Sequence, residues 1–370
     1  MFEYTIEYIP IKGSTDTATE GERRGCDIKP SSQHLSCLQA NPFVVSAESP
    51  AYKIGIVDGR VGGTAYIFPT RILSDGKEVL SASGSELKVE AWARHSGLGF
   101  GMCDFDPDMR DGNHVIFEGG CISQIAVKVH RFMGYRIFEY PRLVMLLKSR
   151  AVVEMKIKNW LAKPISWILD GCIWIYSHII SFVGRVRTID VKVVDVNASD
   201  DVQLSILGKM TETTGTRFAE VHNEKWFRWV LSNSYSSDGP AKAYLMFKKD
   251  KPIGFFMAKE RFHEQASHRG FKNVWLGSVI EWECLPRYEN KLLWGIILWV
   301  MKQRKKLDAV EFPVYEEFAK KFLRRLGWQH VGDANFCYRI RPNSSFKEPE
   351  GMNDPANWRL RPGMGDVALN

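Results

Sequence analysis

Residues 94–99 have the types and spacing of an anion-binding turn. They read Arg-His-Ser-Gly-Leu-Gly and follow an alternating stretch, residues 85–89, that predicts a strand. The glycines Gly97 and Gly99 let the backbone approach a ligand closely, and successive N–H groups at a helix start then point outward. Such a nest suits a pyrophosphate. Short glycine patterns also occur in ordinary loops, so the surrounding elements decide the interpretation.

The composition is that of a globular protein. A chain of 370 residues is long for one domain and predicts two. Hydrophobic residues make up 45% and charged residues 25%, which is ample material for a core. The 50 basic and 43 acidic residues give a net charge of +7. That mild excess suits an anionic ligand or surface and falls short of a nucleic-acid footprint.

The cysteines indicate neither a disulfide framework nor a zinc site. There are seven, an odd number, and no two share the spacing of metal ligands. No metal is therefore expected, and a reducing cytoplasm is the predicted location. The sequence from Met1 shows no basic region followed by an apolar stretch, so no signal peptide is expected.

The elements around the turn are predicted as follows. Strands are expected at residues 51–57, 61–73 and 79–91, with Asp58-Gly59 as a hairpin turn between the first two. The helix after the turn is poorly specified, because an acidic stretch and Pro107 follow it. A strand at 114–117, a helix capped near Ser123 and closed by Gly134, and a strand at 136–147 complete this half.

Apolar residues recur at helical spacing from 165 to 183 and predict a long helix. We expect a helical connector, residues 151–187, packed between two domains. A transmembrane span is not expected, because Asp170 and His178 interrupt an apolar run that is barely long enough. Contact with a membrane surface is the alternative.

The second half repeats the order of the first: strand, helices, meander, helix, strand, helix, strand. Residues 188–342 therefore form a second domain after a first at residues 1–150. Residues 343–370 are rich in proline, glycine and asparagine and predict an extended tail. The predicted class is α+β, with two mixed, mostly antiparallel sheets flanked by helices.

With this element order, the chain resembles a tandem of two GNAT-type (GCN5-related) N-acyltransferase domains, similar to those of some polysaccharide-biosynthesis clusters. That family's loop follows the pattern Gln/Arg-x-x-Gly-x-Gly/Ala, met here by Arg94, Gly97 and Gly99. Its later helix motif, Leu-Tyr-x-x-x-Gly-Phe, is matched by residues 129–135 and again by residues 322–328. The resemblance covers residues 52–147 well and residues 188–340 more loosely.

The resemblance implies acetyl-CoA as the acyl donor. The loop would hold its pyrophosphate, and backbone N–H groups of the preceding strand would polarise its carbonyl. Ser123 would lie near the pantetheine arm, although its role as a helix N-cap is the favoured explanation. The predicted contacts with acetyl-CoA are Leu87, Val89, Arg94, His95, Ser96, Gly97, Leu98, Gly99 and Ser123.

Two residues are candidates for the chemistry. Glu86 lies where several family members carry an acidic residue and could act as general base; the alternative is an exposed strand glutamate. His130 replaces the family's tyrosine and could protonate the CoA thiolate; the alternative is a packing residue. The second domain has no glycine pair after residues 279–283 and carries Leu323 at the tyrosine position. It is therefore expected to be catalytically silent.

The predicted function is transfer of an acetyl group to a primary amine of a small molecule such as an amino sugar. Two alternatives remain: a non-catalytic binding module of the same fold, and an acyltransferase for a nucleic-acid-linked amine. A homodimer is compatible with the sequence.

Overall fold

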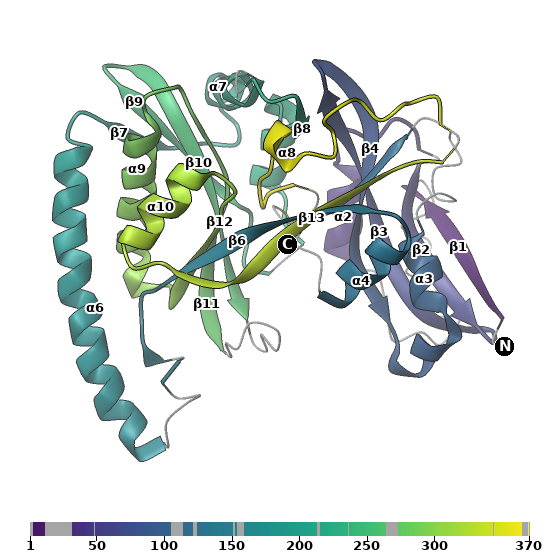
Figure 1. The fold of residues 1–370 in the computed structure, drawn as a ribbon, viewed down its shortest axis with the longest axis horizontal. Coiled ribbons are helices and arrows are strands. Elements are labelled where there is room, and N and C mark those ends of the chain that lie inside the picture. Colours follow the sequence, from purple (N-terminus) through teal and green to yellow (C-terminus); the bar gives the residue numbers. More distant parts are fainter. Residues whose placement is uncertain are drawn as a thin grey trace. The chain divides into compact units, whose positions relative to one another are not determined.

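The computed structural model describes most of the chain: residues 3–11, 32–47, 49–104, 114–120, 124–150, 152–153, 159–212, 215–235, 237–263, 273–342, 344–364 and 369. These residues form two compact units (Figure 1). Unit 1 contains Met1–Glu139, Gly215–Tyr235 and Asn335–Asn370, and unit 2 contains Tyr140–Thr214 and Ser236–Ala334. The units interleave along the sequence, so they do not follow the predicted linear boundaries at residues 150 and 188.

Unit 1 is built on a mixed sheet in the order β1-β2-β3-β4-β5-β13. The ladders from β1 to β4 are antiparallel, β4 and β5 are parallel, and β13 is antiparallel to β5. Its elements are β1 (Tyr4–Pro10), α2 (Ser32–Gln39), β2 (Pro50–Val57), β3 (Arg60–Ser74), β4 (Lys77–Val89), η2 (Ala91–Ser96), α3 (Leu98–Cys103), β5 (Ile116–Gly120), α4 (Gln124–Phe132), β8 (Phe218–Glu220), α8 (Glu224–Ser232), η5 (Pro355–Asn357) and β14 (Trp358–Arg359).

Unit 2 has a sheet with the corresponding order, β7-β9-β10-β11-β12-β6. Its apolar core lies between this sheet and the inner faces of α9 and α10, and includes Phe256, Ile296 and Phe312. Its elements are α6 (Asn159–Arg187), β7 (Lys192–Asp195), α7 (Asp201–Glu212), β9 (Lys242–Lys248), β10 (Lys251–His263), β11 (Val274–Cys284), α9 (Glu289–Lys302), η4 (Gln303–Lys305), β12 (Ala309–Pro313) and α10 (Glu317–Arg325).

Each sheet is closed by a strand from the other half of the sequence. β13 (Gln329–Ile340) follows α10, yet its residues Phe336–Ile340 pair with β5 in unit 1. β6 (Arg136–Leu146) follows α4, yet its residues Arg142–Leu146 pair with β12 in unit 2. The duplicated element order and the α+β class are thus as predicted, and the closing strands are exchanged.

Two tight turns fix the register of the β2–β3–β4 meander. Asp58 and Gly59 have φ angles of 49° and 75°, and Asp75 and Gly76 have φ angles of 46° and 79°. Two consecutive left-handed residues define a type I′ turn, whose twist matches that of the flanking strands. The turns join Val57 to Arg60 and Ser74 to Lys77, and the hairpin predicted at Asp58-Gly59 is confirmed.

The C-terminal segment is packed, contrary to the prediction of an extended tail. Met352, Leu360 and Leu369 are buried, and β14 pairs with β8. The Trp358 ring lies 5.1 to 5.9 Å from the rings of Phe138, Phe218, Phe336 and Tyr338. Proline and glycine prevent long helices and strands here, but the few apolar side chains still enter the core of unit 1.

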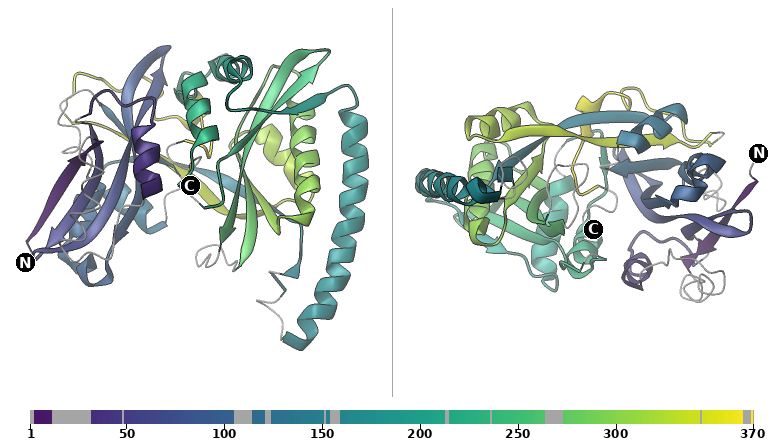
Figure 2. Two further views of the ribbon diagram at one scale, coloured as in Figure 1. Left: turned by 180° about the vertical axis from the view of Figure 1, so that it is seen from behind. Right: turned by 90° about the horizontal axis from the view of Figure 1, so that it is seen from below.

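The long helix also differs from its prediction. α6 packs against α9 within unit 2, and both views show the two helices side by side (Figure 2). Its opposite face is exposed, with Trp167 at 81% and Phe182 at 70%. The expected packing between domains is therefore wrong, because periodicity marks an apolar face without saying what covers it.

The packing of the C-terminal segment predicts the effect of truncating its tryptophan. Trp358→Ala should lower the free energy of unfolding by about 3–5 kcal/mol, because it empties a closed aromatic cluster. Trp167→Ala, on the exposed face of α6, is the matched control and should change it by less than about 0.5 kcal/mol. Urea titration followed by circular dichroism measures both; equal effects would contradict the burial of Trp358.

Candidate functional site

In unit 1, β4 and β5 begin as a parallel pair and then separate. The ladder joins Ser81–Ser83 of β4 to Ile116–Glu118 of β5. Beyond this ladder β4 continues to Val89 and β5 continues to Gly120, but their described residues no longer pair with one another. Among the described residues, β5 therefore does not continue as a neighbour of the second half of β4.

A β-bulge in β4 accompanies this separation. Thr64 pairs with Lys88 and Tyr66 pairs with Ser85, so Glu86 and Leu87 together stand opposite a single residue of β3. Glu86 has a φ of 45°, in the left-handed region that glutamate rarely adopts. A bulge of this kind bends and twists its strand, which re-aims the side chains around it.

Glu86 is held at the bulge by a histidine from α2. His34 Nε2 lies 3.1 Å from Glu86 Oε2, and Lys88 Nζ lies 3.5 Å from the same oxygen. Burial by itself raises the pKa of Glu86, but the hydrogen bond and charge of His34 and the charge of Lys88 outweigh it and lower that pKa. Glu86 is therefore a half-buried carboxylate at neutral pH, and not an exposed strand glutamate.

Two tyrosines enclose the imidazole of His34. Its ring is stacked between those of Tyr66 and Tyr235, at centroid distances of 4.4 and 3.8 Å. Nothing in the sequence connects Glu86 with a histidine in a short polar helix or with a tyrosine after α8, because only the fold brings these residues together.

The predicted pyrophosphate turn lies between two short helices. Gly97, with a φ of 84°, ends η2 and begins α3, so the turn needs glycine there. Arg94 and His95 are exposed, and Gly99 has open space where a Cβ would stand. These features agree with a cationic, open turn.

Two further features of the turn limit the anion nest. The Leu98 N–H donates to the Ser96 hydroxyl at 3.2 Å, so that donor is already used. The Leu98 side chain is buried over glycines of the neighbouring strands, and a Cβ added at Gly55 would lie 2.4 Å from Leu98 Cδ1. Leu98 thus anchors α3 to the sheet, and any anion would bind the remaining N–H groups of the turn.

His130 lies on α4 and is buried. Its Nδ1–H donates to the Ala126 carbonyl at 2.7 Å, and its ring meets the Tyr135 ring edge-on at 4.6 Å. Burial lowers the pKa of His130, so the ring is neutral near pH 7 and its other nitrogen carries no proton. This geometry favours the packing interpretation over a proton donor.

Ser123 lies outside the described residues, so its position is not assigned. Burial raises the pKa of the Cys103 thiol to about 11, as expected for an inert buried cysteine. A pocket of about 330 Å³ in unit 1 lies beside Gly134, and its lining includes none of the predicted site residues.

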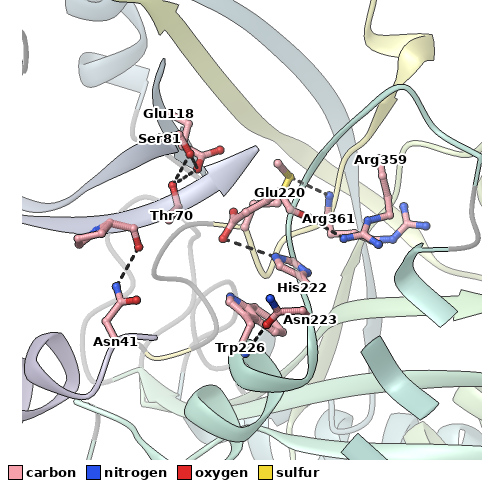
Figure 3. Close-up of polar contacts among 12 residues, drawn as sticks. Asn41, Thr70, Ser81, Glu118, Glu220, His222, Asn223, Trp226, Arg359 and Arg361 are labelled. Atoms are coloured by element: carbon pink, nitrogen blue, oxygen red, sulfur yellow. Dashed lines mark hydrogen bonds and ion pairs between the residues drawn. The ribbon is translucent and has the colours of Figure 1, made fainter. Parts of the chain in front are cut away.

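A buried acidic cluster lies close to the point where β4 and β5 part (Figure 3). Glu118 of β5 accepts hydrogen bonds from Thr70 at 2.5 Å and Ser81 at 3.2 Å. Burial and the neighbouring Glu220 carboxylate raise the pKa of Glu118 well above its usual range, despite these bonds. His222 Nε2 lies 3.5 Å from Glu220 Oε1, and both side chains are fully buried.

The sequence gives little signal for this cluster. Glu118 ends an apolar run, and Glu220 belongs to a three-residue strand, β8, that was not predicted. The cluster therefore depends on tertiary structure: β3, β5 and β8 bring its members together.

Glu118 predicts a pH dependence of stability. Its ordinary pKa of 4.5 applies to the unfolded chain, so above that pH the native state keeps a proton that the unfolded state loses. Stability should thus fall with rising pH, by up to about 1.4 kcal/mol per pH unit, until the raised native pKa is passed. Glu118→Gln should remove this contribution.

Chemical denaturation between pH 5 and pH 8 measures the slope. Ser81→Ala is the control, since it removes a hydrogen bond and keeps the titrating carboxyl, and its slope should persist. A Glu118→Gln slope identical to that of the unaltered protein would contradict a protonated Glu118.

Unit 2 repeats the strand geometry without the glycine turn. β11 and β12 pair over three residues, and Ser278 donates to Glu311 at 2.6 Å. A bulge follows, since Met257 pairs with Glu281 and Ala258 with Val279. After β11 the Leu285 N–H donates to the Ile253 carbonyl of β10, so this donor is already used. The catalytic silence of this half stays a prediction.

No protein-family model and no curated protein matches this sequence. Solved structures do match. The chain superposes on a GCN5-related N-acetyltransferase of Anabaena variabilis with a TM-score of 0.54 and 12% identity, covering 91% of this chain and 73% of that one. A probable N-acyltransferase of Enterococcus faecalis superposes with a TM-score of 0.52 and 10% identity, covering 92% of this chain and 73% of that one.

Saccharomyces cerevisiae N-myristoyltransferase with bound myristoyl-CoA gives a TM-score of 0.56 and 12% identity, covering 92% of this chain and 84% of that one. Because these matches span both units, the chain has the GNAT fold over nearly its whole length. At sequence identities this low, structural similarity establishes the fold alone, and the activity has to be argued from the residues of the site. The link to polysaccharide-biosynthesis clusters stays a prediction.

Proposed function

We propose that this protein is a CoA-dependent N-acyltransferase whose site lies in unit 1. Our proposal is that it transfers an acetyl group from acetyl-CoA to the primary amine of a small molecule, such as an amino sugar. The observation that carries the proposal is the separation of β4 from β5 at a bulge where Glu86 is held by His34. A cytoplasmic location remains part of this proposal.

Separated parallel strands suit a thioester arm. Past Ser83 the described residues of β5 no longer pair with β4, so the N–H groups of Leu87 and Val89 could bind an extended ligand as they would bind a neighbouring strand. The thioester carbonyl would accept a hydrogen bond from the backbone N–H of Leu87 or Val89. Such a fixed donor polarises the carbonyl, because it stabilises the negative charge that develops on the carbonyl oxygen during attack. The exposed Arg94 and His95 would then lie toward the phosphates of CoA.

Glu86 is placed to prepare the amine. An amine attacks only when neutral, and the Glu86 carboxylate would accept its proton, directly or through water. The nitrogen then attacks the thioester carbon, the C–S bond breaks as the tetrahedral intermediate collapses, and the second nitrogen proton passes to sulfur. Atoms and charge balance without a proton from His130.

The surroundings of Glu86 support a small cationic acceptor. The lowered pKa of Glu86 keeps a negative charge on its half-buried side chain, and a negative charge attracts an ammonium group.

The base is tested by Glu86→Gln. This change should lower kcat by about 10²–10⁴-fold with acetyl-CoA and a panel of amino sugars, and leave the KM for acetyl-CoA within about threefold. Glu90→Gln is the matched control, because it removes a carboxylate from the residue directly after the same strand and should leave kcat unchanged. Equal kcat values for Glu86→Gln and the unaltered protein would exclude Glu86 as the base.

The donor is tested at Gly99. Gly99→Trp fills the open space over the turn without the backbone strain expected at Gly97, and should weaken acetyl-CoA binding at least tenfold by calorimetry. Gly99→Ala is the graded control and should bind nearly normally. Titration with myristoyl-CoA alongside acetyl-CoA measures the acyl length; no heat with either donor would refute the proposal.

A further inference from the structure

One face of α6 is apolar and open to solvent. The exposed large side chains on it are Trp167, Ile168, Trp174, Ile175, Ile179, Phe182 and Val186. Between Lys163 and Arg185 the only acidic or basic side chain other than histidine is Asp170. Asp170 faces inward, where its Oδ1 accepts the Ser149 N–H at 2.6 Å. A continuous apolar and uncharged face that is exposed on a folded unit indicates an interaction surface.

The opposite face fastens the helix to unit 2 along its length. Arg304 donates to the Asp170 carbonyl at 3.0 Å, and Tyr176 donates to the Leu326 carbonyl at 2.8 Å. Farther along, Ile180 belongs to the core, and a Cβ at Gly184 would lie 2.9 Å from Leu298 Cδ2. Figure 1 shows α6 lying beside α9 over this stretch.

α6 is long and apolar enough to cross a membrane. Its 29 residues span about 43 Å. Crossing would require it to leave α9 and the hydrogen bonds that hold it, because a folded mixed sheet cannot enter lipid with it. The exposed face can instead meet a membrane from the side, with the helix axis in the plane of the surface.

The charges at the helix ends indicate which surface would cover this face. Lys163 at one end and Arg185 and Arg187 at the other are exposed. If two copies paired through this face by a twofold axis, antiparallel helices would place Lys163 beside the partner's arginine end and oppose like charges. A surface of anionic lipid complements both ends at once, and tryptophan rings favour the lipid–water boundary.

We propose that the exposed face of α6 docks this protein on the surface of membranes that contain anionic lipids. The face supplies apolar side chains that enter the lipid boundary, and the terminal cations contact the headgroups. This inference concerns unit 2 and does not depend on the acyltransferase activity proposed for unit 1.

Sedimentation of the full chain with lipid vesicles tests the proposal. The unaltered protein should bind vesicles of equimolar phosphatidylcholine and phosphatidylglycerol, and bind phosphatidylcholine alone at least tenfold less. The double variant Trp167→Glu with Phe182→Glu should lose at least tenfold in binding to the mixed vesicles. Val202→Glu is the matched control, since Val202 is an exposed apolar residue on α7 of the same unit, and its binding should be unchanged.

The cationic ends have a test of their own. Arg185→Gln and Arg187→Gln should each weaken binding to the mixed vesicles about fivefold, with little effect on phosphatidylcholine alone. An environment-sensitive dye on Cys172, which is exposed on this helix, should shift to the blue with mixed vesicles. Cys172→Ser corrects for labelling elsewhere.

Three outcomes would overturn the proposal. They are failure of the unaltered protein to bind either vesicle, equal loss of binding in the Val202→Glu control, and a dimer in solution that the double variant converts to monomer without vesicle binding. Because Trp167 and Phe182 are exposed, an unchanged melting temperature of the double variant shows that lost binding is not lost folding.

Discussion

The candidate site depends on one residue of β4 that leaves the strand conformation. At Glu86 the backbone takes a left-handed φ of 45°, and two residues of β4 face one of β3. A non-glycine residue in this region costs about 1–2 kcal/mol, which the surrounding contacts must offset. His34, Lys88 and the β3–β4 ladder on either side supply those contacts. The bulge thus lies just beyond the point where β4 and β5 part, and it places the Glu86 carboxylate there.

Buried polar pairs stabilise the start of this separation in both units. In unit 1, Glu118 accepts from Ser81 across the parallel ladder and from Thr70 of the neighbouring β3. In unit 2, Glu311 accepts from Ser278 across the parallel ladder. A buried carboxyl group is stable only when it is hydrogen-bonded. In unit 1, protonation of Glu118 lowers the free-energy cost of burying it further. The two halves share this strand architecture, and differ in the turn that follows it.

The exchange of closing strands makes the two units depend on the whole chain. Unit 1 needs β13 from the end of the second half, and unit 2 needs β6 from the end of the first. Neither half of the sequence can therefore complete its own sheet. The packing of Trp358 and Leu360 in unit 1 extends this dependence to the C-terminal segment.

The sequence by itself determined features that are local. The left-handed residue pairs Asp58-Gly59 and Asp75-Gly76 form the turns of the β2–β3–β4 meander. Alternating and helical spacings of apolar residues indicate most strands and helices. Gly97 indicates the turn before α3. Their order, together with the motifs at residues 94–99 and 129–135, gave the resemblance that predicted the GNAT fold. A short segment encodes its own backbone preference, which is why these local features can be read from the sequence. Tertiary structure decided which distant groups meet: His34 with Glu86, Glu118 with Glu220, and Trp358 with its aromatic cluster. Tertiary structure also decided that one face of α6 is exposed. An apolar stripe in the sequence indicates that burial of that face is favourable, and it does not identify what packs against the face.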